Sequence, residues 1–168
     1  MKKKLLNIYF KILAFLARNY LRKHKPYIIG INGSVGKTSC RMIIFQTLKQ
    51  CFPELKISTS RKNFNGELGM SLSIFEIEEW DPNVGTFFAV LAKVIKKAFF
   101  SRKSYDIIIL EYGIDHPGEM DFLLKIAKPH IGVFTAIDAV HSEQFGNPAE
   151  IAKEEIKMLK STLEIGFL

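Results

Sequence analysis

The 168-residue sequence has two cysteines, one tryptophan and no acidic side chain among its first 26 residues. Cys40 and Cys51 cannot by themselves build a disulfide framework or a zinc site, so we expect reduced thiols in a cytoplasmic protein. No internal repeat or low-complexity segment is present. With 48% hydrophobic and 24% charged residues, the composition is that of a globular domain and excludes a disordered chain.

Because residues 1–26 contain no acidic side chain, the chain has two regions of different net charge. Residues 1–26 hold eight basic side chains, whereas the other 142 residues hold sixteen basic and seventeen acidic ones. The body of the chain is therefore close to neutral, although the sequence pI is 9.4. This distribution excludes a uniformly cationic nucleic-acid-binding protein, and we expect no nucleic acid partner.

The basic N-terminal segment has apolar side chains three and four apart over residues 4–24, which predicts an amphipathic helix. Asn7 and Lys11 interrupt the apolar run, and no small-residue cleavage site follows, so a signal peptide is not expected. A membrane span takes about 20 apolar residues, more than this run offers. Two alternatives stay open. The helix lies on an anionic membrane surface, at the inner face of the membrane, or it packs on the domain with its basic side in water.

Apolar runs alternate with helical patterns in the rest of the chain. The run over residues 106–112, DIIILEY, has the continuous apolar character of a strand buried in a parallel sheet. The patterns predict strands at 27–32, 55–59, 106–112 and 131–135, and helices at 38–50, 86–100, 119–127 and 148–160. This alternation indicates an α/β fold with a mostly parallel, doubly wound sheet.

A glycine-rich turn, GINGSVGKTS over residues 30–39, joins the first of these strands to the helix that follows. Gly33 and Gly36 permit tight turns with inward-pointing amides, which form an anion site together with the helix N-terminus. Lys37 can reach the β- and γ-phosphates of a nucleotide, and the Thr38 hydroxyl can ligate Mg²⁺. The strict pattern G-x-x-x-x-G-K-[ST] is not met, because Ile31 occupies its first glycine position. We predict that the nucleotide contacts Gly33, Ser34, Val35, Gly36, Lys37, Thr38 and Ser39.

Further candidate residues lie where later strands end. Glu111 ends the most apolar strand, and a carboxylate there is costly to bury without a partner. In a phosphate-loop protein the natural partner is a Mg²⁺ ion held by Thr38. Asn63 and Asn65 lie in a glycine-containing loop after the second strand. Their amides can hydrogen-bond phosphate or acyl groups of a substrate, although asparagine and glycine also form ordinary turns.

Four segments together resemble the central, ATP-binding domain of the Mur ligase family: GINGSVGKTS (30–39), NFNGELGMSL (63–72), LEYGIDHPGEMDFL (110–123) and TAIDAVHSEQFG (135–146). The resemblance runs from about residue 27 to the C-terminus and favours the peptidoglycan branch of the family. It implies a cytoplasmic enzyme that uses ATP and Mg²⁺ to join a UDP-muramoyl-peptide-like carboxylate to an amine through an acyl phosphate. Lys37 would stabilise the transferring phosphoryl group, and His141 would help to hold a second Mg²⁺.

The family commonly has a carbamylated lysine in the helix after this histidine. With Phe145 and Gly146 as the anchor, that position falls near Glu155, which would supply a catalytic carboxylate without modification. A small shift of the alignment gives the role to Lys153 instead. Both residues also fit an ordinary solvated helix face.

Two departures from a complete ligase concern the ends of the chain. The segment 1–26 stands where the family has an N-terminal domain that grips the substrate, and residue 168 comes before the family's C-terminal domain. We therefore expect a helix over 1–26 and a truncated ATP-binding domain over 27–168, without full ligase activity alone. The alternative is a non-catalytic nucleotide-binding module that the basic helix tethers to a membrane or a partner.

Overall fold

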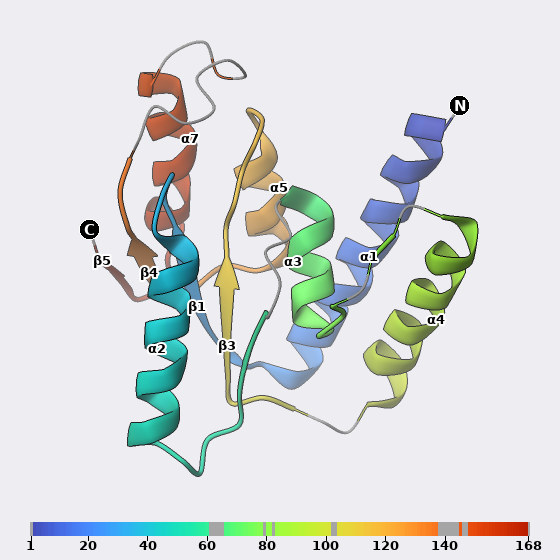
Figure 1. Ribbon diagram of the computed structural model, residues 1–168, viewed down its shortest axis with the longest axis horizontal. Helices are drawn as coiled ribbons and strands as arrows, with labels where there is room; N and C mark the ends of the chain where they lie inside the picture. Colours follow the sequence, from blue (N-terminus) through green and yellow to red (C-terminus); the bar gives the residue numbers. More distant parts are fainter. Residues whose placement is uncertain are drawn as a thin grey trace.

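The computed structural model describes residues 2–60, 66–78, 80–81, 83–101, 104–137, 145 and 148–167. Five parallel strands form a sheet with the order β2-β3-β1-β4-β5 (Figure 1). The strands are β1 (Tyr27–Asn32), β2 (Ile57–Thr59), β3 (Ile107–Glu111), β4 (Ile131–Phe134) and β5 (Ile165–Phe167). The predicted α/β fold with a parallel sheet is confirmed.

The central position of β1 brings the ends of three strands together. Ile31 of β1 lies opposite Glu111 of β3, and Asn32 of β1 lies opposite Phe134 of β4. Because the strands are parallel, the segments that follow β1, β3 and β4 all leave from the same edge of the sheet. In open parallel sheets, this carboxyl edge is where ligands bind.

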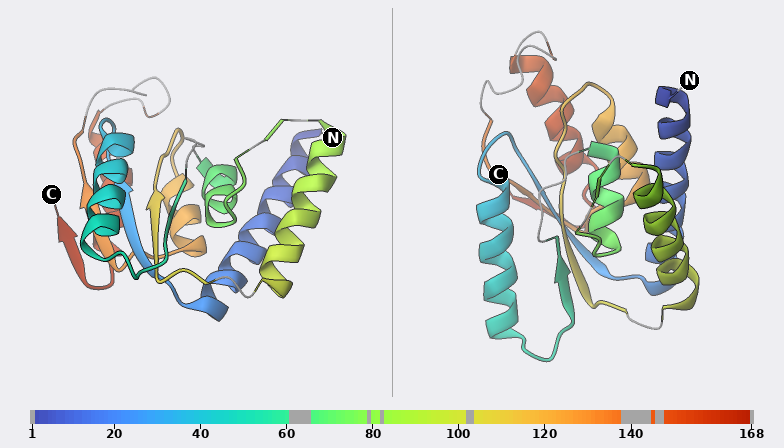
Figure 2. Two further views of the ribbon diagram at one scale, coloured as in Figure 1. Left: turned by 60° about the horizontal axis from the view of Figure 1, so that its bottom comes forward. Right: turned by 45° about the vertical axis from the view of Figure 1, so that its right-hand side comes forward.

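Helices cover both faces of the sheet, in unequal numbers. They are α1 (Lys2–His24), α2 (Lys37–Cys51), α3 (Gly66–Ile74), α4 (Val84–Phe100), α5 (Glu119–Ile126) and α7 (Pro148–Lys160). Figure 2 shows α2 on one face and α3, α5 and α7 on the other, with α1 and α4 as an additional outer layer. The described helices include none that is both long enough and apolar enough to cross a membrane.

The strands divide their side chains between two cores, as the period-two alternation of a strand requires. Ile29, Ile31 and Ile109 pack with the apolar side chains of α2. Their neighbours Ile108 and Leu110 belong to the larger core formed with the other helices. The continuous apolar run of β3 is therefore explained by burial on both faces.

The N-terminal helix α1 is part of the larger core. Leu13 and Ala17 are completely buried, and α1 packs against α3, α4 and α5. The ring of Tyr9 lies 4.7 Å from that of Phe87 in α4, and its hydroxyl donates a hydrogen bond of 3.1 Å to the Phe87 carbonyl. Burial raises the pKa of Tyr9 to about 12. Of the two alternatives for this helix, the structure shows packing on the domain.

Helix α3 was not among the predicted elements. Its sequence, GELGMSLSI, contains two glycines and two serines, which have weak helix propensity. Met70, Leu72 and Ile74 are each at most 2% exposed, so tertiary packing outweighs the local preference. The elements that were predicted lie within about two residues of their predicted limits, as is usual for helix and strand ends.

Candidate nucleotide-binding site

The turn between β1 and α2 depends on two glycines in left-handed conformations. Gly33 has φ 129°, and a Cβ atom there would clash with Oγ1 of Thr135 and lie 2.9 Å from the Ala136 carbonyl oxygen. Gly36 has φ 82° and is the N-cap of α2, so the turn leads directly into the helix. The first amides of α2 have no partner within the helix and are available to an anion in the turn.

The turn between β1 and α2, called the phosphate loop below, is hydrogen-bonded to Thr135 and Ala136, which follow β4. The amide of Ser34 donates to the Ala136 carbonyl at 2.7 Å, and the amide of Thr135 donates to the Asn32 carbonyl at 2.9 Å. The Thr135 hydroxyl lies 2.6 Å from the carbonyl oxygen of Val35. Two of the four segments that resemble the family are thus in direct contact, and one fixes the backbone of the other.

Lys37 provides a positive charge over the loop. Its Nζ donates to the carbonyl oxygens of Gly33 at 2.5 Å and Ser34 at 3.2 Å. Thr38 is half-buried in the first turn of α2, whereas Val35 and Ser39 are exposed. Backbone amides, a lysine and a hydroxyl therefore lie together in one turn, as phosphate binding requires.

Glu111 pairs with an arginine that the sequence analysis did not single out. Arg41 in α2 is 1% exposed, and its Nε donates to Oε1 of Glu111 at 2.5 Å. Its Nη1 donates to Oγ1 of Thr59, the last residue of β2, at 3.2 Å. The available signal was spacing, because Arg41 follows Lys37 by four residues and shares its helix face. The guanidinium thus supplies a charge partner for the Glu111 carboxylate, whose side chain is only 13% exposed.

The structure brings Glu155 of α7 to the phosphate loop. Glu155 is 3% exposed, and the Ser34 hydroxyl donates to its Oε1 at 3.2 Å. Its backbone carbonyl accepts a hydrogen bond of 2.8 Å from the side chain of Asn32. Lys153, in contrast, has a side chain that is 71% exposed and pairs with Glu150 at 2.5 Å. Of the two alternatives for this position, Glu155 faces the loop and Lys153 faces solvent.

Oxygen donors at this edge suit Mg²⁺ better than a softer metal. They are the hydroxyl of Thr38 and the carboxylates of Glu111 and Glu155. The buried Oδ1 of Asn32, in the same turn, has no hydrogen-bond partner among the described residues. Within those residues, no three histidine, cysteine or acidic side chains form a metal-binding group. The donor set therefore fits an ion that is held largely by the phosphates of a nucleotide.

Three predicted site residues, Asn63, Asn65 and His141, lie outside the described residues. The described residues beside them do reach the carboxyl edge. Gly66 donates from its amide to the Gly113 carbonyl, just beyond β3, at 3.1 Å, and Ala136 contacts the phosphate loop. Their roles stay predictions.

The start of α5, within the third resembling segment, is held by carboxylates that accept from backbone amides. Oε2 of Glu119 accepts from the amides of Asp115 at 2.7 Å and His116 at 3.1 Å. Oε1 of Glu154 in α7 accepts from the amide of Gly118 at 2.9 Å. These contacts give both glutamates a structural role at a helix N-terminus.

Known proteins are similar to this chain in sequence and in fold. Residues 31–168 match the family model of the Mur ligase middle domain. The UDP-N-acetylmuramoyl-tripeptide–D-alanyl-D-alanine ligase of Bacillus subtilis (strain 168) is 26% identical over 153 residues, which are 91% of this chain and 28% of that protein. The enzyme of the same name from Rickettsia prowazekii (strain Madrid E) is 27% identical over 157 residues, covering 94% and 29%. The crystal structure of MurF ligase from Thermotoga maritima in complex with ADP has a TM-score of 0.72 and 26% identity, covering 95% and 32%.

These matches extend further toward the N-terminus than the four segments. Residues 27–168 number 142, whereas the two sequence alignments span 153 and 157 residues, so the likeness includes part of α1. The family model itself begins at residue 31, close to the expected start near residue 27. The chain spans less than a third of the length of these relatives. Because the family model covers most of the chain, from residue 31 to residue 168, the protein belongs to the Mur ligase family.

Proposed function

We propose that this chain is the ATP-binding part of an ATP-dependent ligase that forms an amide bond in peptidoglycan precursor synthesis. The observation that carries the proposal is the phosphate loop, with Lys37 folded over it and the buried Glu155 carboxylate facing it. The ADP bound to the Thermotoga maritima relative supports a nucleotide ligand. The names of the two sequence relatives support a UDP-muramoyl-peptide-like carboxylate and a D-alanyl-D-alanine amine as substrates. On the family resemblance, we propose a cytoplasmic location.

In the proposed reaction, an oxygen of the substrate carboxylate attacks the γ-phosphorus of ATP. The bond from that phosphorus to the β-phosphate oxygen breaks, and ADP leaves. The nitrogen of the amine then attacks the carbonyl carbon of the acyl phosphate, phosphate leaves, and the nitrogen loses a proton as the amide forms. Negative charge on the transferring phosphoryl group makes electrostatic stabilisation the main requirement of the first step.

Each site residue has a proposed part in that stabilisation. Lys37 exchanges its contacts with the loop carbonyls for contacts with phosphate oxygens, and the amides from Gly33 to Ser39 bind the phosphates. Mg²⁺ would be held by Thr38 and Glu111, and by His141 on the family resemblance; when bound, it neutralises phosphate charge. Glu155 orients the loop through Ser34 and takes the place of the family's carbamylated lysine. Asn63 and Asn65 are proposed to hold the substrate.

Titration of the chain with Mg-ATP tests the loop. Lys37→Ala removes charge-assisted hydrogen bonds that contribute about 1.5–3 kcal/mol, so we expect affinity to fall by about 10- to 150-fold. Lys49→Ala, an exposed lysine at the other end of α2, is the matched control and should leave affinity unchanged. Equal affinities of wild type and Lys37→Ala would contradict the assignment.

A second pair of variants tests the carboxylate. Glu155→Gln keeps the side-chain shape and removes its charge, so the gain in ATP affinity on addition of Mg²⁺ should decrease. Lys153→Gln, two residues away and exposed, should preserve that gain. The reverse result would favour Lys153 as the functional residue.

The chemical step is tested separately, by phosphate release from Mg-ATP with UDP-muramoyl tripeptide and D-alanyl-D-alanine. Release that requires both substrates supports the ligase reaction. Nucleotide binding without release from this chain alone fits both the ATP-binding part of a ligase and a module without catalysis, because the chain is not expected to have full ligase activity alone.

A further inference from the structure

Helix α1 carries a second apolar stripe that the core does not use. Its members are spaced three, four and three residues apart, which places them on one side of the helix. They are Leu5, Ile8, Ile12 and Phe15, with exposed fractions of 71%, 54%, 41% and 52%. The buried side of α1 is formed by other residues, among them Tyr9, Leu13 and Tyr20. The helix therefore presents two apolar faces, and the fold accounts for one of them.

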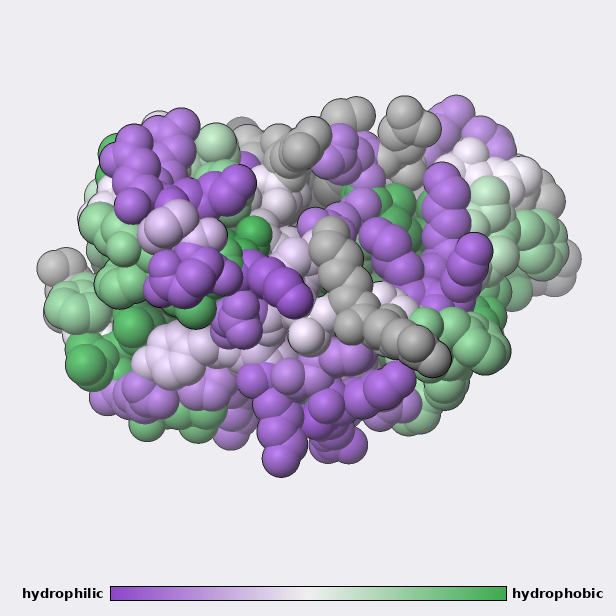
Figure 3. Space-filling model, turned by 90° about the horizontal axis from the view of Figure 1, so that it is seen from below, coloured by the Kyte–Doolittle hydropathy of each residue, from purple (hydrophilic) through white to green (hydrophobic). Residues whose placement is uncertain are grey.

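Helix α4 has the same two-sided character. Val90, Val94 and Ala98 are buried in the larger core, whereas Phe88, Ile95 and Phe99 are 71%, 40% and 56% exposed. Spacings of seven and four residues place the exposed three on one side. Seen from below, the molecule shows hydrophobic surface at both ends, and α1 and α4 lie at the right-hand one (Figure 3).

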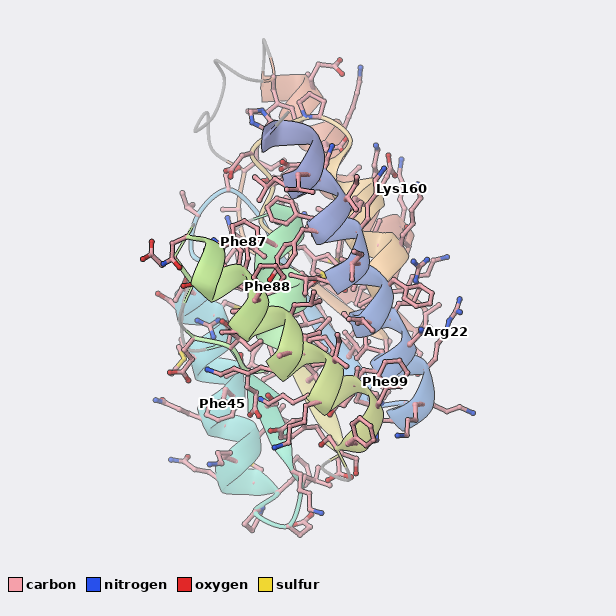
Figure 4. The ribbon with its side chains drawn as sticks, turned by 90° about the vertical axis from the view of Figure 1, so that its right-hand side faces the viewer. Arg22, Phe45, Phe87, Phe88, Phe99 and Lys160 are labelled. Atoms are coloured by element: carbon pink, nitrogen blue, oxygen red, sulfur yellow. The ribbon has the colours of Figure 1, made fainter. Side chains whose placement is uncertain are left out.

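The two exposed stripes adjoin, because α1 and α4 run side by side in the same direction (Figure 4). Tyr9 contacts Phe87 near the start of α4, and Lys23 donates from Nζ to the Phe99 carbonyl at 3.3 Å near its end. The seven exposed side chains Leu5, Ile8, Ile12, Phe15, Phe88, Ile95 and Phe99 are called the apolar seam below. A contiguous exposed apolar surface of this kind marks an interaction site.

Positive charge accompanies the apolar seam. Residues 1–26 and α4 together hold eleven basic and no acidic side chains, whereas the rest of the chain holds thirteen basic and seventeen acidic ones. Lys11, Arg18 and Arg22 follow each other at seven and four residues along α1, and Lys93 and Lys96 are exposed on α4.

Beside α1, the positive charge continues into a groove of about 950 Å³ between α1 and α5. Arg18, Arg22, Lys25, Lys125 and Lys128 line it together with a single carboxylate, that of Asp121, which pairs with Lys157 at 2.7 Å. Basic side chains therefore border the apolar seam along α1 and line the adjoining groove.

We propose that the apolar seam and its flanking cations dock this protein on the surface of an anionic lipid bilayer. Apolar side chains of helices that lie in the membrane plane enter the boundary between headgroups and acyl chains, while lysine and arginine attract anionic lipids. A second copy of the chain is a poor occupant, because it would place two acid-free, strongly basic faces against each other. The phosphate loop connects β1 and α2, which are not part of the apolar seam, so docking leaves the nucleotide site accessible (Figure 2).

Co-sedimentation with vesicles tests the proposal. The 168-residue chain should bind vesicles of equal parts phosphatidylglycerol and phosphatidylcholine at low salt, and bind pure phosphatidylcholine much more weakly. Phe88→Glu with Phe99→Glu should reduce binding at least about tenfold, because two charges replace inserted rings. Ile43→Glu with Phe52→Glu is the matched control at two exposed apolar residues of α2 and its C-cap, and should bind as wild type does.

A second pair of variants addresses the cations and leaves the apolar side chains unchanged. Each cation near an anionic surface contributes about fivefold in binding, so Lys11→Gln with Arg22→Gln should lose about 25-fold on the anionic vesicles. Lys49→Gln with Lys56→Gln, on the opposite side of the fold, should lose little. Thermal midpoints close to that of the wild type establish that each variant is folded.

Three results would overturn the proposal. The first is a wild-type protein that binds anionic and neutral vesicles equally well, or that binds neither kind. The second is wild-type binding by both the phenylalanine and the lysine-arginine variants. The third is a dimer in sedimentation velocity that the phenylalanine variants convert to a monomer, which would make a second copy the occupant of the apolar seam.

Discussion

The buried ion pair between Arg41 and Glu111 allows a quantitative test of how α2 is joined to the sheet. Arg41→Met keeps most of the aliphatic side chain and removes the guanidinium. Glu111 then loses its charge partner, and Oγ1 of Thr59 loses a donor. Because Arg41 is 1% exposed, water has little access to replace the lost contacts.

The expected loss of stability follows from these exposures. Removing one partner of a buried ion pair costs about 3–5 kcal/mol. Glu111 keeps 13% of its side chain exposed and can recover part of its hydration, so we expect the lower end, about 3 kcal/mol. For a domain of this size, that corresponds to a decrease of about 6–12 °C in the thermal midpoint.

A double-mutant cycle separates the pair from its surroundings. Arg41→Met with Glu111→Gln leaves no unpaired buried charge, so it should be more stable than the sum of the two single losses predicts, by at least about 1 kcal/mol. Urea unfolding can be followed by the fluorescence of Trp80, whose ring lies 5.7 Å from that of Tyr9. Lys49→Met, an exposed position of the same helix, should cost less than about 1 kcal/mol.

Two results would refute this reasoning. A loss below about 1 kcal/mol for Arg41→Met would show that the guanidinium does not compensate a buried charge. Additive single losses in the cycle would show that the two side chains do not act as a pair.

Three further predictions concern other parts of the fold. Leu13→Ala should lower the free energy of unfolding by about 2–5 kcal/mol, and Leu5→Ala, at the exposed side of α1, by less than about 0.5 kcal/mol; equal losses would contradict the packing of α1. Burial, with a smaller contribution from Lys23, lowers the pKa of His24 below its ordinary 6.5, so the unfolded chain takes up the proton first and stability should fall as pH drops through and below 6.5. In thermal melts, His24→Phe should reduce that loss of stability. Melting temperatures that fall equally with pH in the wild type and in His24→Phe would contradict this prediction. Glu154→Ala should cost about 1–2 kcal/mol, because the start of α5 loses its acceptor, whereas Glu154→Gln should cost less; identical melting curves for the two variants would argue against the cap.

The strands and the phosphate loop could be predicted because their determinants are local. β1 and β3 are short apolar runs bounded by polar residues, and the turn at 33–38 needs glycine at defined positions. Glu155 could be proposed from its distance along the chain from a recognised motif. The spacing from Lys37 could draw attention to Arg41, but its pairing with Glu111 could not be predicted, because the two lie 70 residues apart and their contact depends on how α2 crosses β3.

The N-terminal helix shows a different limit. An amphipathic pattern indicates that one side of a helix meets an apolar environment, but it does not distinguish a protein core from a lipid surface. One apolar stripe of α1 packs in the core and another faces solvent. In the sequence, both appear as a single pattern of apolar residues three and four apart. Only the positions of α3, α4 and α5 show that Leu13 is buried and Ile12 is not.

The central position of β1 has a consequence for the order in which the chain folds. β1 is synthesised before the other four strands of its sheet, yet its neighbours β3 and β4 follow only at residues 107–111 and 131–134. Until then, both of its edges lack their strand partners, and the loops to be closed are long. α1, β1 and α2 therefore leave the ribosome well before the strands that pair with β1. The nucleotide site is complete only after α7 is made and Glu155 reaches a phosphate loop that was synthesised more than 100 residues earlier.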